Sequence, residues 1–181
     1  DDSMTGGSKK DTFKGGDGDD VLDGGADNDI LDGGANNSGT GTGDWADYST
    51  RTAGIEITLV SGAATAYVDT LSNGIETHTA TEEEEDTLTG IENIKGSTVK
   101  DSLTGDSTAN SLLGMAGADT LAGGLGNDYI DGGGDNDTVS YSGQKKIKVN
   151  LGESLTVTVD TDNDGSFVTG DNETDTLASI E

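Results

Sequence analysis

The sequence predicts an all-β fold, a flattened coil of short parallel strands in two repeat blocks with irregular strands between them. Three observations predict it. A nine-residue period occupies two stretches of the 181-residue chain, glycine and aspartate recur at fixed places of that period, and an apolar residue follows two places after the aspartate. A fixed short period is typical of solenoid proteins, in which each repeat stacks on its neighbours.

The repeat units can be aligned without gaps in each stretch. Three units run from residue 6 as GGSKKDTFK, GGDGDDVLD and GGADNDILD, and five run from residue 96 as GSTVKDSLT, GDSTANSLL, GMAGADTLA, GGLGNDYID and GGGDNDTVS. Glycine holds the first place of every unit. The sixth place holds Asp11, Asp20, Asp29, Asp101, Asn110, Asp119, Asp128 and Asp137. The eighth place holds Phe13, Leu22, Leu31, Leu103, Leu112, Leu121, Ile130 and Val139.

Each place of the unit has a physical interpretation. The last three places form a short strand whose middle side chain points to one face while its mostly polar neighbours point to the other. The first six places form a turn, because glycine adopts positive φ without steric cost. If the chain reverses at every turn, each turn lies over the turn two units later. The apolar places then form a thin core between two parallel sheets, and the aspartates form rows along the two edges.

Composition limits the classes of partner. The chain has 36 acidic and 9 basic residues and a formal net charge of −27, so nucleic acid and anionic membranes would be repelled. There is no cysteine, which excludes disulfides and thiolate metal sites. No stretch of 18 apolar residues occurs, so membrane insertion is not expected.

Stacked aspartates repel one another unless a cation lies between them. Calcium takes six to eight oxygen ligands and mixes carboxylates with backbone carbonyls, which glycine turns bring close together. Magnesium fits less well, because it requires a smaller octahedron and retains its water. The sequence therefore predicts several Ca²⁺ ions in the edge rows.

The units GGDGDDVLD and GGLGNDYID resemble the calcium-binding nonapeptide G-G-x-G-x-D-x-U-x of RTX (hemolysin-type) proteins, and both match every fixed place. The other six units are degenerate. The resemblance implies a parallel β-roll, a β-helix-like solenoid, in a fragment of a bacterial protein exported by type I secretion. The expected metal ligands are Asp11, Gly16, Gly18, Asp20, Asp29, Asp44, Asp101, Asn110, Gly117, Asp119, Gly124, Gly126, Asp128 and Asp137.

Stacking each turn over the second turn that follows predicts specific pairs. Asp11 is expected to pair with Asp29. A second edge run of Asp101, Asp119 and Asp137 would hold two ions, and Asn110 would share a poorer site with Asp128. Asp20 needs a partner in the turn that starts at Gly33, where the unit contains about six inserted residues; that partner is Asp44.

A longer repeat overlies the short one. DYSTRTAGIEITL parallels SYSGQKKIKVNL, and TEEEEDTLTGIE parallels DNETDTLASIE, each about ninety residues later. We therefore expect a first repeat block over 6–49, a connecting strand and loop segment over 50–95, a second block over 96–142, and a strand and loop segment over 143–181 that leads to a further block.

The segment DTDNDGSFVTGD is a separate signal. Asp160, Asp162, Asp164, Ser166 and Asp171 have the spacing of an EF-hand calcium loop. The loop ends with aspartate instead of glutamate and follows a strand instead of a helix. A second type of calcium loop and a polar turn between strands both remain open.

These features predict a calcium-binding module that folds on binding calcium outside the cell and supports type I secretion and stability of a larger protein. The expected location is secreted or at the bacterial cell surface, the expected partners are calcium and the type I secretion machinery, and the expected state is a monomer. Two alternatives are a spacer or interaction segment of a large surface adhesin, and the C-terminal module of a secreted protease, lipase or toxin. No enzymatic activity is expected within this chain, because no nucleophile lies beside a base; His78 is the single histidine.

Overall fold

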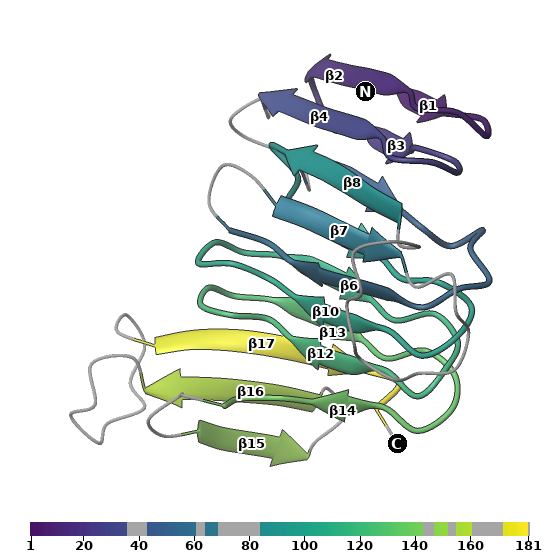
Figure 1. Ribbon diagram of the computed structural model, residues 1–181. Helices are drawn as coiled ribbons and strands as arrows, with labels where there is room; N and C mark the ends of the chain where they lie inside the picture. The colour runs from purple at the N-terminus through teal and green to yellow at the C-terminus, as the bar shows by residue number, and fades with distance from the viewer. Residues whose placement is uncertain are drawn as a thin grey trace.

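The computed structural model describes residues 1–35, 43–60, 64–68, 84–142, 147–151, 155–160 and 172–180, and these residues form strands and turns without a helix. Two sheets face each other along a flattened solenoid (Figure 1). The first sheet contains, in spatial order, β1 (Ser3–Thr5), β3 (Val21–Asp23), β5 (Trp45–Asp47), β9 (Asn93–Lys95), β11 (Ser111–Leu113), β13 (Tyr129–Asp131), β17 (Asn172–Ala178), β16 (Leu155–Asp160) and β15 (Ile147–Leu151). The second sheet contains β14 (Thr138–Val139), β12 (Thr120–Ala122), β10 (Ser102–Thr104), β6 (Ile55–Thr58), β7 (Ala64–Val68), β8 (Glu84–Thr89), β4 (Ile30–Ala35) and β2 (Thr12–Asp17).

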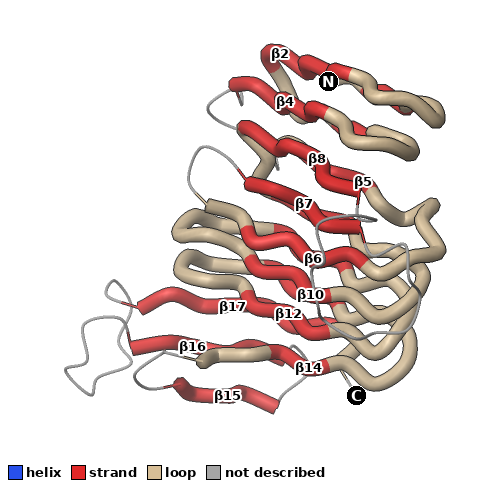
Figure 2. The backbone as a smooth tube through the Cα atoms, viewed as in Figure 1, coloured by secondary structure: helices blue, strands red, loops and turns tan. Residues whose placement is uncertain are grey.

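Successive strands of a repeat block alternate between the two sheets, and each pairs in parallel with the strand two units later. Ser3 lies opposite Val21, and Ser102 lies opposite Thr120, each 18 residues apart. Glycine-rich turns connect the strands at both edges (Figure 2). The parallel β-roll predicted from the nine-residue period is confirmed. β2 and β4 are longer than the expected three residues, because pairing continues into their turns as far as Asp17 and Ala35.

In the repeat blocks the core is one residue deep on each sheet. A three-residue strand has only one inward side chain, and this is the apolar eighth place of the unit. The buried side chains of the block strands are Leu22, Ala46, Ile94, Leu112 and Ile130 in the first sheet and Leu31, Leu103 and Leu121 in the second, to which the first meander adds Ile55, Ile57, Ala64, Ala66, Val68 and Leu88. Met4, Phe13 and Val139 lie in the terminal layers and are only partly buried.

The strands outside the repeat blocks form two antiparallel meanders that extend the sheets. In the first meander, β7 runs antiparallel to β6 and β8, while β8 pairs in parallel with β4 and β6 pairs in parallel with β10. In the second, β16 runs antiparallel to β15 and β17, and β17 pairs in parallel with β13. β8, β7 and β6 fill the second sheet between β4 and β10 (Figure 1).

The number of coil strands determines which sheet receives each meander. The first block ends after β5, which lies in the first sheet, so the chain crosses over and the first meander extends the second sheet. The second block contains one more strand and ends at β14 in the second sheet, so its meander extends the first sheet. At the junction of the blocks, β5 therefore pairs directly with β9, and the two blocks share one continuous solenoid.

Candidate metal centre

The sixth-place residues, together with equivalent acids outside the aligned units, form two rows, one along each edge of the roll. The turns that precede strands of the first sheet contribute one row: Asp2, Asp20, Asp44, Glu92, Asn110, Asp128 and Asp175. The turns that precede strands of the second sheet contribute the other: Asp11, Asp29 and Asp86, and after the interruption by β7 and β6, Asp101, Asp119 and Asp137.

Neighbouring coils in each row are connected by hydrogen bonds to one carboxylate oxygen, Oδ1. Asp29 Oδ1 accepts the Asp11 N–H at 2.7 Å, Asp119 Oδ1 accepts the Asp101 N–H at 2.8 Å, and Asp137 Oδ1 accepts the Asp119 N–H at 3.0 Å. In the other row, Asp44 Oδ1 accepts the Asp20 N–H at 2.7 Å, and Asp128 Oδ1 accepts the Asn110 N–H at 2.9 Å. These bonds hold the acids of neighbouring coils in register.

The second carboxylate oxygen has a different environment. The Oδ2 atoms of Asp20, Asp29, Asp44, Asp119 and Asp137 are buried and accept no hydrogen bond. A buried carboxylate oxygen without a partner is costly unless a cation compensates it. The rows therefore leave one oxygen of each of these aspartates available for a cation.

Backbone carbonyls lie beside these oxygens at the first-place glycines. A Cβ atom at Gly15 would overlap both Asp20 Oδ2 and the carbonyl oxygen of Gly33, and one at Gly114 would overlap Asp119 Oδ2 and the carbonyl oxygen of Gly132. Only glycine allows carboxylate and carbonyl to approach so closely. The first-place glycine therefore lies beside both a carboxylate oxygen and a backbone carbonyl oxygen, and both can ligate a cation.

Burial raises the pKa of several row carboxyls. Desolvation raises the pKa of Asp119 to about 7, with the negative charges of Asp101 and Asp137 adding to it, although the bond from the Asp101 N–H opposes the shift. Desolvation also raises the pKa values of Asp101 and Asp44 to about 6. The ion-free rows thus hold carboxyls that lose part of their charge near neutral pH.

This donor set suits a hard divalent cation. Among the described residues no group of three or more His, Cys, Asp or Glu side chains is placed to hold a metal by itself, so backbone carbonyls have to complete any coordination sphere. Carboxylate oxygen together with several carbonyls is the ligand set of calcium. Two places offer this ligand set. One combines Asp119 with the glycine turn that begins at Gly114, and the other combines Asp20 with the turn that begins at Gly15.

The structure brings together the pairs that the sequence predicts. Asp11 stacks on Asp29, Asn110 on Asp128, and Asp101, Asp119 and Asp137 follow one another along one edge. The N–H of Asp20 bonds to Asp44, and β3 pairs with β5 at a spacing of 24 residues instead of 18, which leaves room for six inserted residues. Their role as calcium ligands stays a prediction.

The predicted glycine ligands lie in the turns with positive φ. Gly16, Gly18, Gly117, Gly124 and Gly126 have φ values between 97° and 132°. Of the predicted EF-hand-like loop, Asp160 ends β16. Asp162, Asp164, Ser166 and Asp171 lie outside the described residues.

Sequence reasoning missed four members of the rows. Asp2 and Glu92 precede the first coil of each block, and Asp86 and Asp175 begin the returning coil of each meander. Glu92 Oε2 accepts the Asp44 N–H at 2.9 Å, Asp86 Oδ1 accepts the Asp29 N–H at 2.8 Å, and Asp175 Oδ1 accepts the Asp128 N–H at 3.0 Å. The available signal for three of them was the short pattern of an acid, an apolar residue two places later and glycine two places after that, as in Asp86, Leu88 and Gly90; Asp175 has Ser179 at the glycine place.

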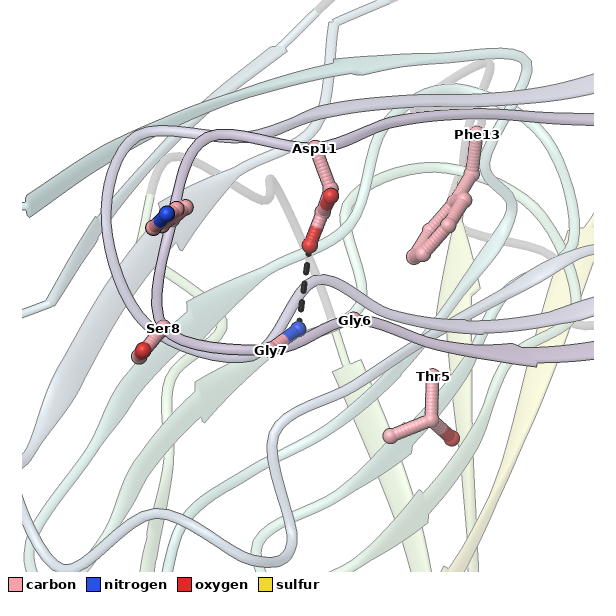
Figure 3. A pocket seen from close by; sticks show the side chains of 7 residues that line it. Thr5, Gly6, Gly7, Ser8, Asp11 and Phe13 are labelled. Carbon is pink, nitrogen blue, oxygen red and sulfur yellow. Dashed lines mark hydrogen bonds between the residues drawn. The ribbon is translucent and has the colours of Figure 1, made fainter.

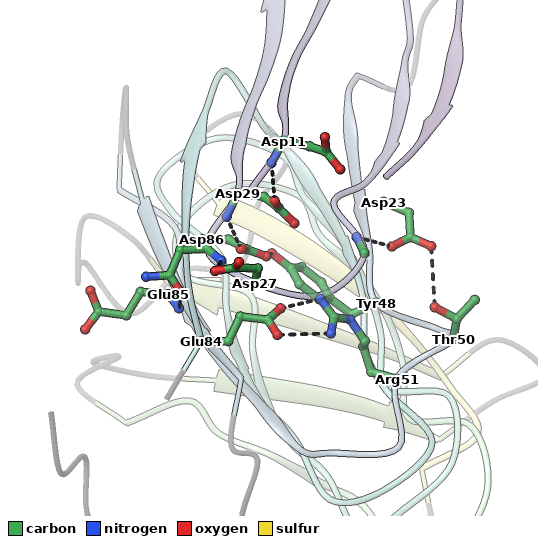
Figure 4. A network of polar contacts seen from close by, with 12 residues as sticks. Asp11, Asp23, Asp27, Asp29, Tyr48, Thr50, Arg51, Glu84, Glu85 and Asp86 are labelled. Atoms are coloured by element: carbon green, nitrogen blue, oxygen red, sulfur yellow. Dashed lines mark hydrogen bonds and ion pairs between the residues drawn. The ribbon is translucent and has the colours of Figure 1, made fainter. Parts of the chain in front are cut away.

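A tyrosine contacts the acid that begins the returning coil of each meander. The buried Tyr48 hydroxyl donates to Asp86 Oδ2 at 2.9 Å (Figure 4), and Tyr141 forms a hydrogen bond that lowers the pKa of Asp175, although burial raises that pKa on balance. Beside Tyr48, Arg51 forms a bidentate ion pair with Glu84, whose side chain is 9% exposed. These contacts fasten the first meander to the roll.

A family model agrees with this geometry. The model of the RTX calcium-binding nonapeptide repeat matches residues 5–38 and 104–139, in four copies. No curated protein sequence matches the chain. Among solved structures, the chain is similar to the crystal structure of the extracellular lipase LipA from Serratia marcescens, with 14% identity and a TM-score of 0.37; the match covers 99% of this chain and 36% of the lipase chain. The chain thus spans about a third of that lipase's length. The period and the stacked acid rows of these two stretches agree with their match to the RTX calcium-binding nonapeptide repeat.

Proposed function

We propose that this chain is a calcium-driven folding module of an exported protein. The observation that carries the proposal is the set of buried Oδ2 atoms, at Asp20, Asp29, Asp44, Asp119 and Asp137, that have no hydrogen-bond donor. A core one residue deep contributes little apolar burial, and a net charge of −27 opposes compaction. Folding then depends on neutralising the rows.

The residues that would hold the ions are the row acids and the carbonyls of their turns. Bound calcium would supply positive charge to carboxylates that the fold buries. An ion that binds the folded chain and not the unfolded chain stabilises folding by about 2.7 kcal/mol per site at a hundredfold excess over its dissociation constant. Two such sites reach the lower end of the usual stability of a domain, about 5 kcal/mol.

The dependence on calcium supports a role in export. A chain of this charge stays extended where calcium is scarce and folds where it is abundant, so folding would be delayed until the chain reaches the outside of the cell. We infer a secreted or cell-surface location and a parent protein that uses type I secretion. We also infer that the chain has no catalytic activity of its own. Within the described residues no helix has the length and apolar character needed to cross a membrane.

The test is far-ultraviolet circular dichroism of chelator-treated chain during titration with calcium, with magnesium as the control. The expected result is a cooperative change from coil to β signal with calcium alone. A chain already folded in chelator, or one that responds equally to magnesium, would contradict the proposal.

A further inference from the structure

The turns of the roll have two conformations, which differ at the second place of the repeat unit. In one conformation the second-place residue has a φ value between 80° and 111°, as at Gly16, Gly25, Gly34, Met115, Gly124 and Gly133. We call these the open turns, and they end at Asp20, Asp29, Asp44, Asp119, Asp128 and Asp137. In the turns over 6–11, 96–101 and 105–110, none of the second-place residues has positive φ; they are Gly7, Ser97 and Asp106. We call these the self-bonded turns.

In each self-bonded turn, the second-place N–H donates to the sixth-place side chain. The bonds run from Gly7 to Asp11 Oδ2 at 3.0 Å (Figure 3), from Ser97 to Asp101 Oδ2 at 2.6 Å, and from Asp106 to Asn110 Oδ1 at 2.8 Å. The other oxygen of Asp101 accepts the Ser97 hydroxyl at 2.7 Å and the Ile55 N–H at 2.8 Å. Both oxygens of this buried carboxylate therefore already have protein donors.

A polar side chain at the second place stabilises two of the self-bonded turns. The Val99 N–H donates to Ser97 Oγ at 3.2 Å, and the Thr108 N–H donates to Asp106 Oδ1 at 2.8 Å. Serine and aspartate side chains make such bonds to the backbone two residues later, and glycine has no side chain with which to do so. The loss of the second-place glycine from these two units thus favours the self-bonded conformation.

In the open turns the second-place N–H does not satisfy the acid. The Gly25 N–H donates to Asp23 Oδ1 at 3.0 Å, and Asp29 Oδ2 of the same turn is buried without a donor. The corresponding oxygens of four more open turns are also buried without a donor, at Asp20, Asp44, Asp119 and Asp137. Positive φ at the second place therefore accompanies a carboxylate oxygen that still needs a positive group.

Both kinds of turn bring the sixth-place oxygen close to a carbonyl of the next coil on the same edge. A Cβ atom at Gly96 would overlap Asp101 Oδ2 and the Gly114 carbonyl oxygen, as one at Gly114 would overlap Asp119 Oδ2 and the Gly132 carbonyl oxygen. Two acceptor oxygens this close together, away from water, require a donor or a cation. At Asp101 the Ser97 N–H is that donor, whereas at Asp119 the position is suited to a calcium ion.

We propose that calcium binds only at the open turns. The ions then form two groups, one with Asp20, Asp29 and Asp44, and the other with Asp119, Asp128 and Asp137. The acids and amide of the self-bonded turns are not ligands, although they lie in the same rows. The inference rests on the calcium-driven folding proposed above and narrows its ligands from all row acids to those of the open turns.

Protein donors alone satisfy the acids between the two groups. The self-bonded turns over 96–101 and 105–110 lie on opposite edges in consecutive coils. On the other side of β6 and β7, Asp86 Oδ2 accepts the Tyr48 hydroxyl at 2.9 Å (Figure 4). The middle of the solenoid is thus held by hydrogen bonds, and each group of ions stabilises the coils on its own side.

The number of bound ions in two asparagine variants tests this assignment. Asp101→Asn should leave the number of calcium ions per chain unchanged in equilibrium dialysis, whereas Asp119→Asn should lose one. Asn110 stands at the same place of the next turn, so a self-bonded turn accommodates asparagine. Loss of one ion in both variants would overturn this inference and leave the proposed function intact. A wild-type chain that binds no calcium would overturn both.

A second pair of variants converts one turn and decides the question even if Asp101→Asn fails to fold. Ser97→Gly combined with Val99→Gly gives the turn over 96–101 the glycines of the open turn over 15–20, and it should add one ion per chain. The control combines Ser97→Ala with Val99→Ala, which removes the same hydroxyl but disfavours positive φ, and it should keep the wild-type number. Equal numbers of ions in the two double variants would overturn the inference.

Met115 tests the open conformation itself. It is 41% exposed and has a φ of 80°, a value that is costly for a side chain of this kind. Met115→Gly should therefore raise the melting temperature in saturating calcium by about 2–4 °C relative to Met115→Ala, which keeps the Cβ atom. Equal melting temperatures would show that this turn is not open in the calcium-bound chain and would overturn the inference.

Discussion

At the scale of single residues, the two carboxylate oxygens of a row aspartate such as Asp119 have different hydrogen-bond partners. Oδ1 of Asp119 is bonded to the Asp101 N–H and positions the coil, whereas Oδ2 is buried without a donor. An asparagine has one carbonyl oxygen in place of two carboxylate oxygens, and its NH₂ group cannot ligate a cation. At Asn110 the NH₂ group donates to the Glu92 carbonyl at 2.8 Å and Oδ1 accepts the Asp106 N–H at 2.8 Å, so the side chain bonds to the preceding coil without a second oxygen.

Asp119→Asn should therefore remove one calcium site while the coil is kept. We expect one ion fewer by calorimetric titration and a loss of about 2.7 kcal/mol of stability at a hundredfold calcium excess. The control is Asp135→Asn, which removes the same charge from an exposed turn residue with φ of 74°, a conformation that asparagine tolerates. Equal ion counts in the two variants would show that Asp119 is not a ligand.

The requirement for glycine at the first place of the unit can be tested by comparing two glycines of one turn. A Cβ at Gly132 would overlap Asp137 Oδ2 and lie 2.6 Å from the Ser179 carbonyl oxygen, whereas a Cβ at Gly134 would meet only the Met115 carbonyl oxygen at 3.9 Å. Gly132→Ala should lower the free energy of unfolding by about 1–3 kcal/mol and weaken calcium binding. Gly134→Ala should change neither in thermal unfolding followed with and without calcium. Similar losses in both variants would contradict the steric argument.

At the scale of elements, a tyrosine contact fastens each meander to the roll. β6, β7 and β8 lie between two calcium-repeat layers, and the acid that begins the returning coil, Asp86, is bonded to Tyr48. Burial and the negative charge of Asp86 raise the pKa of the Tyr48 hydroxyl well above its usual value, so it stays protonated and remains a donor. The tyrosine thus satisfies an oxygen that elsewhere in the row has no donor.

Tyr48→Phe should destabilise the fold without changing the number of bound ions. Removing a hydrogen bond to a charged group costs about 1.5–3 kcal/mol, and the loss should persist at saturating calcium. Tyr129→Phe is the matched control, since that side chain is 39% exposed and its hydroxyl lies 3.4 Å from Asp131 Oδ2. Full recovery of the Tyr48→Phe variant at high calcium would mean that an ion can replace the hydroxyl.

At the scale of the whole molecule, protons and calcium compete for the same rows. In the ion-free fold, the pKa of Asp119 is raised to about 7 and those of Asp44 and Asp101 to about 6, from a usual value of 3.8. At pH values between the usual pKa and the raised pKa of each group, the folded chain holds a proton that the unfolded chain has released. The contribution of these three carboxyls to the stability of the ion-free fold is therefore greatest at low pH and decreases as pH rises from about 4 to about 7.

Calcium binding should show the opposite dependence on pH. Acidification from about pH 8 to about pH 5 should raise the calcium concentration needed for half-maximal folding, because protons occupy the carboxylates that the ion requires. In chelator, the same acidification should increase the β signal in circular dichroism. A calcium midpoint that is constant over this range would show that the row carboxyls keep ordinary pKa values.

Much of the site could be predicted because its information is local. The place of Leu22 or Leu121 in its unit determines which side chain points inward, and the nine-residue period places Asp101, Asp119 and Asp137 in consecutive coils of one edge. Even the delayed partner Asp44 could be found, because the strand that follows it keeps its pairing with β3 despite the inserted residues. The calcium role of these residues is still a prediction.

By itself, then, the sequence determined the coil, its thin core and most members of the acid rows, since each depends on residues within two repeat units of one another. Only the tertiary structure decided that the segments outside the repeats form meanders, that β5 lies directly on β9, and that Asp86, Glu92 and Asp175 extend the rows. These outcomes depend on pairings between residues 46 to 57 positions apart. They also depend on whether a block ends in the first or the second sheet, which the addition of a single nine-residue unit reverses.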